Sequence, residues 1–200
     1  MFVANGESQE PIRRWAIPGG GERTGGWGEN SSISYPNGPL AFSPDGHILA
    51  TAFLKQFNDG ERHESVVVLW DAKKAREHGQ LRASPRSPHA ESLAFSPDGK
   101  LLAGIYGPDL IVWDVAARKE VARHQPSKKH FKGLAFTPDG TRLLTASNEE
   151  SIRVWVAPTW AEATGYAWKV GKLGCVAVSA DGTLAAAGGS TGKVVVWDLD

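Results

Sequence analysis

Cysteine is almost absent from this 200-residue chain, whose single Cys175 leaves no partner for an internal disulfide. Long apolar runs are missing too, since none approaches the roughly twenty residues that a membrane span needs. The Met1 end lacks the basic start and apolar stretch of a secretory signal. These absences predict a cytoplasmic protein that makes no membrane contact.

Net charge is also lacking, because 22 Lys and Arg residues balance 22 Asp and Glu residues. A balanced chain has no global field to steer it toward nucleic acid or an anionic membrane. Basic residues do gather at 72–88 and 116–132, but without the interleaved aromatics of a base-stacking platform. We therefore expect no nucleic-acid partner, and we interpret these charges as protection of edge strands against pairing with other chains.

What the chain does contain is a unit of about forty residues that recurs four times. Each unit opens with a Phe-Ser-Pro-Asp-Gly turn or a close variant and closes on a tryptophan. Both markers keep the same period, apart from a longer first gap caused by an insertion at about residues 55–64. The turn aspartates are Asp45, Asp98, Asp139 and Asp181, and the closing pairs are Trp70-Asp71, Trp113-Asp114, Trp155-Val156 and Trp197-Asp198.

The turn and the closing strand together predict a small antiparallel sheet in every unit. Proline presets the backbone of such a turn, aspartate bonds to nearby amides, and glycine accepts a positive φ. The closing strand at residues 65–70 is apolar at successive positions instead of alternating, so it needs cover on both faces. Stacked sheets provide that cover, whereas the more polar segment after each tryptophan fits an outermost strand.

Repeated in phase, these motifs resemble the WD40-repeat β-propeller family, in which each unit builds one four-stranded blade. The resemblance implies an all-β fold in a single array over residues 1–200. A partial blade at 1–15 would end at Trp15, where the other closing tryptophans stand. Successive units would then cover about 16–71, 72–114, 115–156 and 157–200.

The number of blades leaves two geometries open. Four blades could close into an unusually small ring, or the chain could form an arc whose missing blades lie upstream or in a second chain. Propellers use about four to eight blades, and the WD40 type favours the larger numbers. We therefore expect the open arc.

The chain departs from its family at two polar positions. Many WD40 units carry a Gly-His pair before the first strand and an aspartate before the closing strand, which build a network with a Ser or Thr and the tryptophan. No Gly-His dipeptide occurs here, and Glu64, Gly107, Glu149 and Thr191 stand where the aspartate would fall. We expect the closing tryptophans to lose partners for their indole N–H groups, leaving the blades more dependent on apolar packing.

Catalytic and metal-binding patterns are missing from the sequence. The six histidines lack zinc-site spacing, the glycine runs lack a phosphate-loop ending, and no nucleophile, base and orienting acid can be assembled. We expect no metal, no cofactor and no enzymatic activity. The turn aspartates, closing pairs and Trp15 are interpreted as architectural, and Cys175 as a small core side chain.

The sequence therefore predicts a non-catalytic scaffold whose loops bind other proteins. Aromatic and cationic residues in loops are the candidate contacts, because such residues are common interaction hot spots. For Trp27, Trp160 and Trp168, packing against a blade edge is an equal alternative, which stability measurements on a Trp168→Ala variant would resolve. The candidates are Trp27, Tyr35, His63, His89, Lys128, Lys129, His130, Trp160, Trp168 and Lys169.

Two other functions stay open at this stage. The chain could be the C-terminal regulatory portion of a larger enzyme or signalling protein. It could also be a propeller enzyme in its own right, which the missing catalytic groups disfavour. The identity of the protein partner does not follow from the sequence.

Overall fold

The computed structural model describes residues 2–4, 12–14, 35–56, 63–83, 87–125 and 130–199. Every regular element in these ranges is a β-strand, and all strand pairs are antiparallel. The strands form three four-stranded sheets, one three-stranded sheet and a two-stranded hairpin. We call the four larger sheets blades 1 to 4, in chain order.

Each blade is a meander in which consecutive strands are neighbours. Blade 1 contains β3 (Tyr35–Phe42), β4 (Ile48–Gln56), β5 (His63–Asp71) and β6 (Arg76–Arg82). Blade 2 contains β7 (Ser92–Phe95), β8 (Leu101–Tyr106), β9 (Asp109–Asp114) and β10 (Lys119–His124). Blade 3 contains β11 (Phe131–Phe136), β12 (Arg142–Ser147), β13 (Ser151–Val156) and β14 (Ala161–Ala167). Blade 4 contains β15 (Leu173–Val178), β16 (Leu184–Gly189) and β17 (Val194–Asp198).

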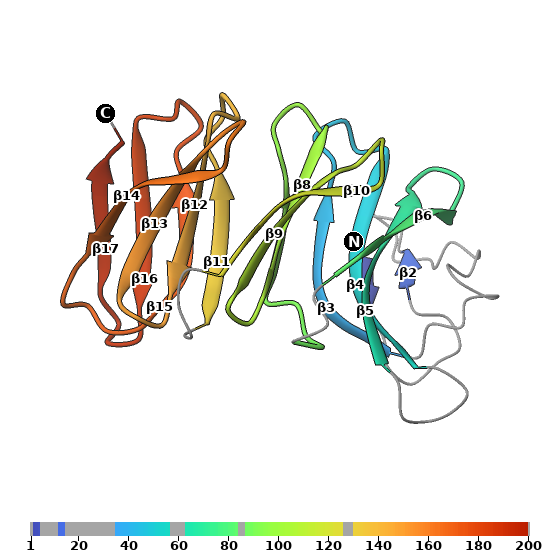
Figure 1. Ribbon diagram of the computed structural model, residues 1–200, viewed down its shortest axis with the longest axis horizontal. Coiled ribbons are helices and arrows are strands. Elements are labelled where there is room, and N and C mark those ends of the chain that lie inside the picture. Colours follow the sequence, from blue (N-terminus) through green and yellow to red (C-terminus); the bar gives the residue numbers. More distant parts are fainter. Residues whose placement is uncertain are drawn as a thin grey trace, which may run out of the picture.

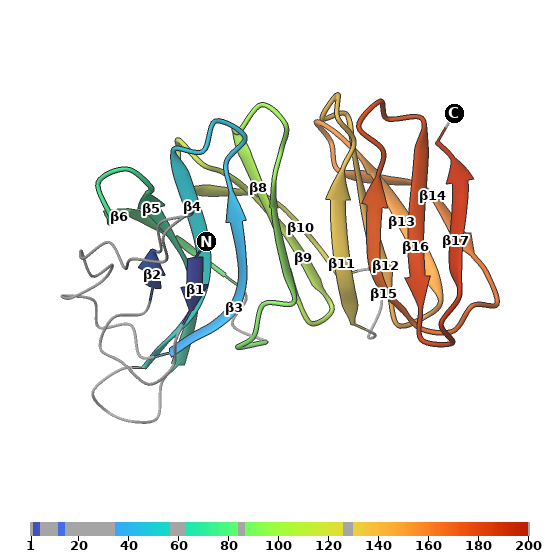
Figure 2. The ribbon, with the colours of Figure 1, turned by 180° about the vertical axis from the view of Figure 1, so that it is seen from behind.

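The blades stack face to face in an arc that does not close into a ring (Figure 1). Blade 4 lies at one end of the long axis and blade 1 at the other, and the reverse view shows the same order (Figure 2). The hairpin of β1 (Phe2–Ala4) and β2 (Ile12–Arg14) lies beyond blade 1 in both views. The expected all-β fold and open arc are confirmed.

The insertion in the first unit lengthens one hairpin of blade 1. Strands β4 and β5 pair from Ile48–Asp71 out to Gln56–His63, whereas β8 and β9 of blade 2 pair only from Leu101–Asp114 to Tyr106–Asp109. The added residues therefore extend this hairpin beyond the length found in the neighbouring blade, and the stacking of the sheets is kept.

Every blade has two faces with different side chains, because strand residues alternate between them. The forward face points to the next blade along the chain, and the rear face points to the previous one. In blade 2 the forward face includes the cross-strand pairs Ala103–Val112 and Ile105–Leu110. These four residues form one buried cluster with the rear face of blade 3, which contributes Leu134, Phe136, Leu143 and Trp155.

The same contact recurs at the other two junctions of the arc. The forward face of blade 1 packs against the rear face of blade 2, and blade 3 packs in the same way against blade 4. The closing strand of blade 2 lies between two neighbouring blades, which explains its continuous apolar sequence; Leu110 to Trp113 are at most 1% exposed. The outer strands β6, β10 and β14 are polar and largely exposed.

The closing tryptophans do find polar partners in three blades, so the expectation that they lack them is wrong there. Trp70 Nε1 donates to Thr51 Oγ1 at 2.8 Å, and Trp155 Nε1 donates to Thr145 Oγ1 at 3.0 Å. Trp113 Nε1 instead donates to the backbone carbonyl of Arg82 in blade 1, at 2.8 Å. Only Trp197 keeps a buried indole nitrogen without a hydrogen bond among the residues described.

Replacing Thr145 with valine is expected to destabilise the protein by about 1–3 kcal/mol. Valine preserves the shape of threonine but leaves the buried Trp155 indole N–H without an acceptor. Urea unfolding of the full chain measures the loss. Thr145→Ser is the matched control because it keeps the hydroxyl. A serine variant that loses as much stability as the valine variant would show that the methyl group, not the hydrogen bond, matters.

Candidate functional site

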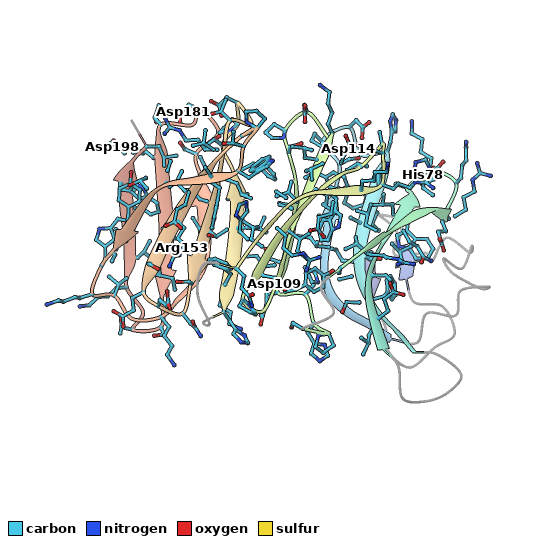
Figure 3. The ribbon with its side chains drawn as sticks, viewed as in Figure 1. His78, Asp109, Asp114, Arg153, Asp181 and Asp198 are labelled. Atoms are coloured by element: carbon cyan, nitrogen blue, oxygen red, sulfur yellow. The ribbon has the colours of Figure 1, made fainter. Side chains whose placement is uncertain are left out.

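The arc has two long edges that differ in chemistry. The turn edge carries the four Asp-Gly turns and the turns that follow the closing strands. The loop edge carries the segments that lead into each first strand and the hairpins between second and third strands. Figure 3 shows Asp114, Asp181, Asp198 and His78 at the turn edge and Asp109 toward the opposite edge.

Each turn aspartate accepts hydrogen bonds from donors within its own turn. In blade 1, Asp45 Oδ1 accepts from Ser43 Oγ at 2.6 Å and from the His47 amide at 3.0 Å. Gly46 follows with φ of 68°, a conformation that disfavours other residues. Serine or threonine at the same position serves Asp98, Asp139 and Asp181. In each turn, Oδ1 of the aspartate therefore accepts hydrogen bonds from donors of the same turn.

The same contacts lower the pKa of every turn aspartate. Donation from the Thr137 hydroxyl is the main cause for Asp139, whose pKa falls to about 2, and Thr141 adds further donors. Serine hydroxyls lower the pKa of Asp45, Asp98 and Asp181 in the same manner. Such groups stay ionised at neutral pH and are unsuited to general acid catalysis.

The aspartates that follow two closing tryptophans also act within turns. Asp71 Oδ1 accepts from the amides of Lys73 at 3.0 Å and Lys74 at 2.9 Å, and the Lys74 amide is the main cause of a lowered Asp71 pKa. Asp114 Oδ1 accepts from the Ala117 amide at 2.7 Å. Asp198 is exposed at the end of β17.

A surface hollow of about 330 Å³ lies on the turn edge of blade 1, lined by His47, Ile48, Asp71, Lys73, Lys74 and His78. Its polar groups are engaged with one another. His47 Nδ1 lies 3.1 Å from Asp45 Oδ2, while its Nε2 lies 2.8 Å from Lys73 Nζ. The hollow holds no serine, threonine or cysteine that an adjacent base could activate.

Three titratable side chains, those of Tyr106, Asp109 and His124, are buried or partly buried. Burial raises the pKa of the Tyr106 phenol well above its usual range. Burial also lowers the pKa of His124, whose ring lies 4.9 Å from that of Trp155. Asp109 is 1% exposed and lies 3.6 Å from Arg123. In the described ranges no cluster of histidine, cysteine or acidic residues suits a metal ion, and no helix could cross a membrane.

The loop edge carries four of the candidate contact residues. His89 and His130 are exposed in the segments that lead into blades 2 and 3. Trp168 and the exposed Lys169 stand in the segment that leads into blade 4. Lys132 Nζ and Glu91 Oε1, 2.7 Å apart, join the first-strand regions of blades 2 and 3. The structure therefore distributes four predicted contacts along one edge.

Other predicted contacts are less completely placed. Tyr35 is the first residue of β3, and its backbone pairs with Leu54. His63 is the first residue of β5, and its backbone pairs with Gln56. Trp15, Trp27, Lys128 and Lys129 lie outside the described residues.

Trp160 contradicts its assignment as a partner contact. Its side chain is 3% exposed and lies edge-on to Phe136, with ring centroids 6.1 Å apart. It belongs to the cluster between blades 2 and 3. Trp160 therefore fits the alternative interpretation, in which its side chain packs against the blade.

Trp168 occupies an intermediate position. It is half-buried and stacks on Tyr166, with centroids 5.6 Å apart and planes at 10°. Its ring also lies 4.7 Å from that of Trp197. Part of the indole therefore supports the closing tryptophan of blade 4, while part faces solvent.

Cys175 is exposed, so its interpretation as a core side chain is wrong. It lies on the forward face of blade 4, opposite Gly188 in the adjacent strand. In blade 3 the corresponding residue, Gly133, is covered by the next sheet: a Cβ there would lie 2.9 Å from Cys175 Cα. In blade 3 the equivalent position is covered by the next sheet. The side chain of Cys175 is exposed because no described sheet follows blade 4.

Comparison with known proteins agrees with the repeats seen in the fold. The family model described as WD domain, G-beta repeat matches residues 120–156 and 167–198, which end at the closing strands of blades 3 and 4. The chain therefore contains WD40 repeats at these residues. A curated relative, mitogen-activated protein kinase-binding protein 1 of Mus musculus, is 48% identical over 63 residues. That match covers 30% of this WD40 chain and 4% of the relative.

Several residues that hold the WD40 blades together escaped the sequence analysis. Thr51 and Thr145 each stand six residues after a turn aspartate, so their recurrence in phase was an available signal. Arg118 crosses to blade 1, where its guanidinium donates to the His78 carbonyl and covers Gly79. No pattern in the sequence pointed to that contact, because it joins residues of two sheets across an outer strand.

Acid is expected to remove the contribution of the Asp139 turn to stability. Its pKa is about 2 in the folded protein against a usual 3.8, so that contribution is complete above pH 3.8 and is lost as the pH falls toward 2. The variant Asp139→Asn keeps a hydrogen-bond acceptor in the turn, but its side chain does not titrate. The unfolding midpoints of wild type and variant, measured in urea from pH 7 to pH 2, should converge below pH 3.8. A difference that stays constant over this range would argue against the turn carboxylate.

The two loop tryptophans are expected to differ in their effect on stability. Trp160→Ala empties a buried aromatic site and should cost about 3–5 kcal/mol. Trp168→Ala should cost less but still lower the melting temperature, because Trp168 contacts Trp197. Thermal unfolding compares the two variants, and Trp160→Phe, which preserves a ring against Phe136, serves as control. Equal melting temperatures for the two alanine variants would contradict the difference in burial.

Proposed function

We propose that this chain is a non-catalytic, cytoplasmic scaffold that binds another protein through its loop edge. The proposal rests on one observation: His89, His130, Trp168 and Lys169 all lie on that edge. Aromatic and cationic side chains of this kind provide binding energy when a partner excludes water around them.

The contrast between the two edges supports this choice. On the turn edge, hydroxyl and amide donors of the same turn occupy the carboxylates, so a partner would have to compete with these hydrogen bonds. On the loop edge, sequence differs from blade to blade while the sheets below stay alike. Loops that vary on a stiff framework are the usual place for recognition.

The proposal also fits the family. WD40 repeats typically mediate protein interactions, and the name of the mouse relative describes it as binding a mitogen-activated protein kinase. Since the match covers only 4% of that relative, its partner does not transfer to this chain on similarity alone.

A second candidate is a regulatory WD40 portion within a larger enzyme or signalling protein. The short match to the mouse relative favours it, because there the matching residues are a small part of a long protein. This candidate and the scaffold share the loop edge as the binding surface. They differ in whether an enzymatic activity belongs to the same polypeptide, which the genomic reading frame decides.

The loop edge can be tested with matched triple variants. The binding variant replaces His89, His130 and Lys169 with alanine. The control replaces two histidines and one lysine of the turn edge, His47, His78 and Lys100. Immobilised chains are incubated with an extract of the source cells, and retained proteins are cross-linked and identified by mass spectrometry.

A partner of the loop edge should bind wild type and the turn-edge control but be reduced at least about tenfold on the loop-edge variant, the equivalent of 1.4 kcal/mol. Retention that survives the loop-edge variant and disappears in the control would assign binding to the other edge. Retention no greater than that of a chain-free matrix would contradict the scaffold proposal itself.

A further inference from the structure

The outer edge of β17 distinguishes it from the closing strands of the other blades. Strands β5, β9 and β13 each pair with an outer strand, namely β6, β10 and β14. Among the residues that the structure describes, β17 pairs with β16 alone. Its other edge therefore presents backbone N–H and C=O groups that no described strand pairs. The sequence from Val194 to Trp197 also carries no charge that would discourage a further strand.

A hollow of about 290 Å³ adjoins β17 on the forward face of blade 3. Leu199, which follows β17, lines it together with Val154, and these residues are 5% and 3% exposed. Arg142 also lines it and donates from its guanidinium to the Leu199 carbonyl. The ring of Tyr166 lies 5.9 Å from that of Trp197 in β17. The remaining lining residues are Val156, Ala163 and Thr164.

The repeat shows what fills the same place one junction earlier. Counted from the turn aspartate and the closing tryptophan, four lining residues of the hollow correspond to residues between blades 2 and 3. Those four belong to or pack against the buried cluster that contains Trp160. An indole that is 3% exposed therefore occupies there the space that stays open here. The pairs, with the lining residue first, are Arg142 and Leu101, Val154 and Val112, Thr164 and Ala122, and Leu199 and Ala157.

The position of Trp160 links the hollow to the open strand edge. Trp160 has a φ of 56°, and the outer strand β14 begins at the next residue. Ala75 and Arg118 hold the same position before β6 and β10, with φ of 52° and 55°. The Arg118 guanidinium reaches the preceding blade, where it donates to the His78 carbonyl. At both junctions the residue before an outer strand thus contacts the preceding blade, so strand and anchor form one unit.

We propose that β17 and the hollow together bind an extended segment of another protein. The segment adds to blade 4 as a fourth strand, antiparallel to β17, and the residue before this strand inserts a large aromatic side chain into the hollow. Backbone hydrogen bonds to β17 supply affinity, while the hollow selects the aromatic residue. Arg142 favours such a residue, because a guanidinium is attracted to the face of an aromatic ring. This site does not depend on the loop edge and goes beyond the function proposed above.

A second copy of the chain does not fit as the source of this strand. If two β17 edges paired across a two-fold axis, both copies of blade 3 would lie on the same side of the joined sheet. On that side Tyr166 of β14 contacts Trp197, and the hollow extends to Ala163 and Thr164 of the same strand. The two copies of β14 would therefore compete for one space. A segment with no blade behind it avoids this conflict.

The outer strand of blade 3 supplies the probe for this site, because it carries an aromatic anchor at the matching position. A fluorescein-labelled peptide with the sequence of residues 160–167 is titrated with the full chain, and fluorescence anisotropy measures binding. Alanine in place of Trp160 in the peptide should weaken binding at least about tenfold. Prolines in place of Thr164 and Gly165 should do the same, because two successive prolines remove backbone donors on both sides of the strand.

Matched variants of the chain test the hollow. Ala163→Phe fills the hollow from an exposed position of β14 and should weaken peptide binding at least about tenfold. Ala161→Phe is the control, since Ala161 is exposed on the same strand but does not line the hollow. Circular dichroism verifies that both variants are folded. Bound peptide should also slow hydrogen exchange of the β17 amides, which filling of the hollow alone would not do.

The outcomes separate this site from its alternatives. A peptide that shows no saturable binding up to about 1 mM would overturn the proposal, and so would equal binding to wild type and Ala163→Phe. Exchange of the β17 amides that is unchanged in the bound state would place the peptide elsewhere. Self-association of the chain that the peptide displaces would assign the strand edge to a second copy, and would overturn the proposal as well.

Discussion

The whole structure depends on the packing of one forward sheet face against the next rear face. Each isolated sheet is apolar on both sides, so none could bury its closing strand alone. At the first two junctions, leucine and phenylalanine from a first strand and tryptophan from a third strand pack against a mainly aliphatic surface. At the third junction, Val176 and Val178 of the first strand take this role beside Trp197. Stability is therefore a property of neighbouring blades. The closing tryptophan of blade 4, Trp197, is only half-buried, whereas Trp70 of blade 1 is 1% exposed.

Polar interactions add to this packing by holding the closing tryptophans in fixed positions. Thr51 and Thr145 hold the indoles of their own blades, while Trp113 reaches across to the backbone of blade 1 and thus links two blades. The turn aspartates close their hairpins with local donors and do not couple one blade to another. The turn edge is consequently uniform, whereas loops on the other edge can differ without disturbing the junctions.

The period of the sequence predicted the strands, their order and the open arc, because hairpin turns and closing strands are local features. It could not predict partners that lie one strand or one sheet away. Thr145 satisfies Trp155 from the adjacent strand, so the absence of a Gly-His pair did not leave that indole unpaired. Trp160 and Cys175 were misassigned for a related reason. The burial of Trp160 depends on contact with the preceding blade, and the exposure of Cys175 depends on whether another sheet follows, and neither can be read from the local sequence.

The protection of the sheet edges contrasts with the openness of the end face. Outer strands β6 and β10 carry arginine, lysine and glutamate, which discourage strand pairing with other chains. On the forward face of blade 4, Val194 and Val196 are more than half exposed, and Leu184 is exposed opposite Asp198. An apolar sheet face of this kind in water is either an interface or an aggregation hazard.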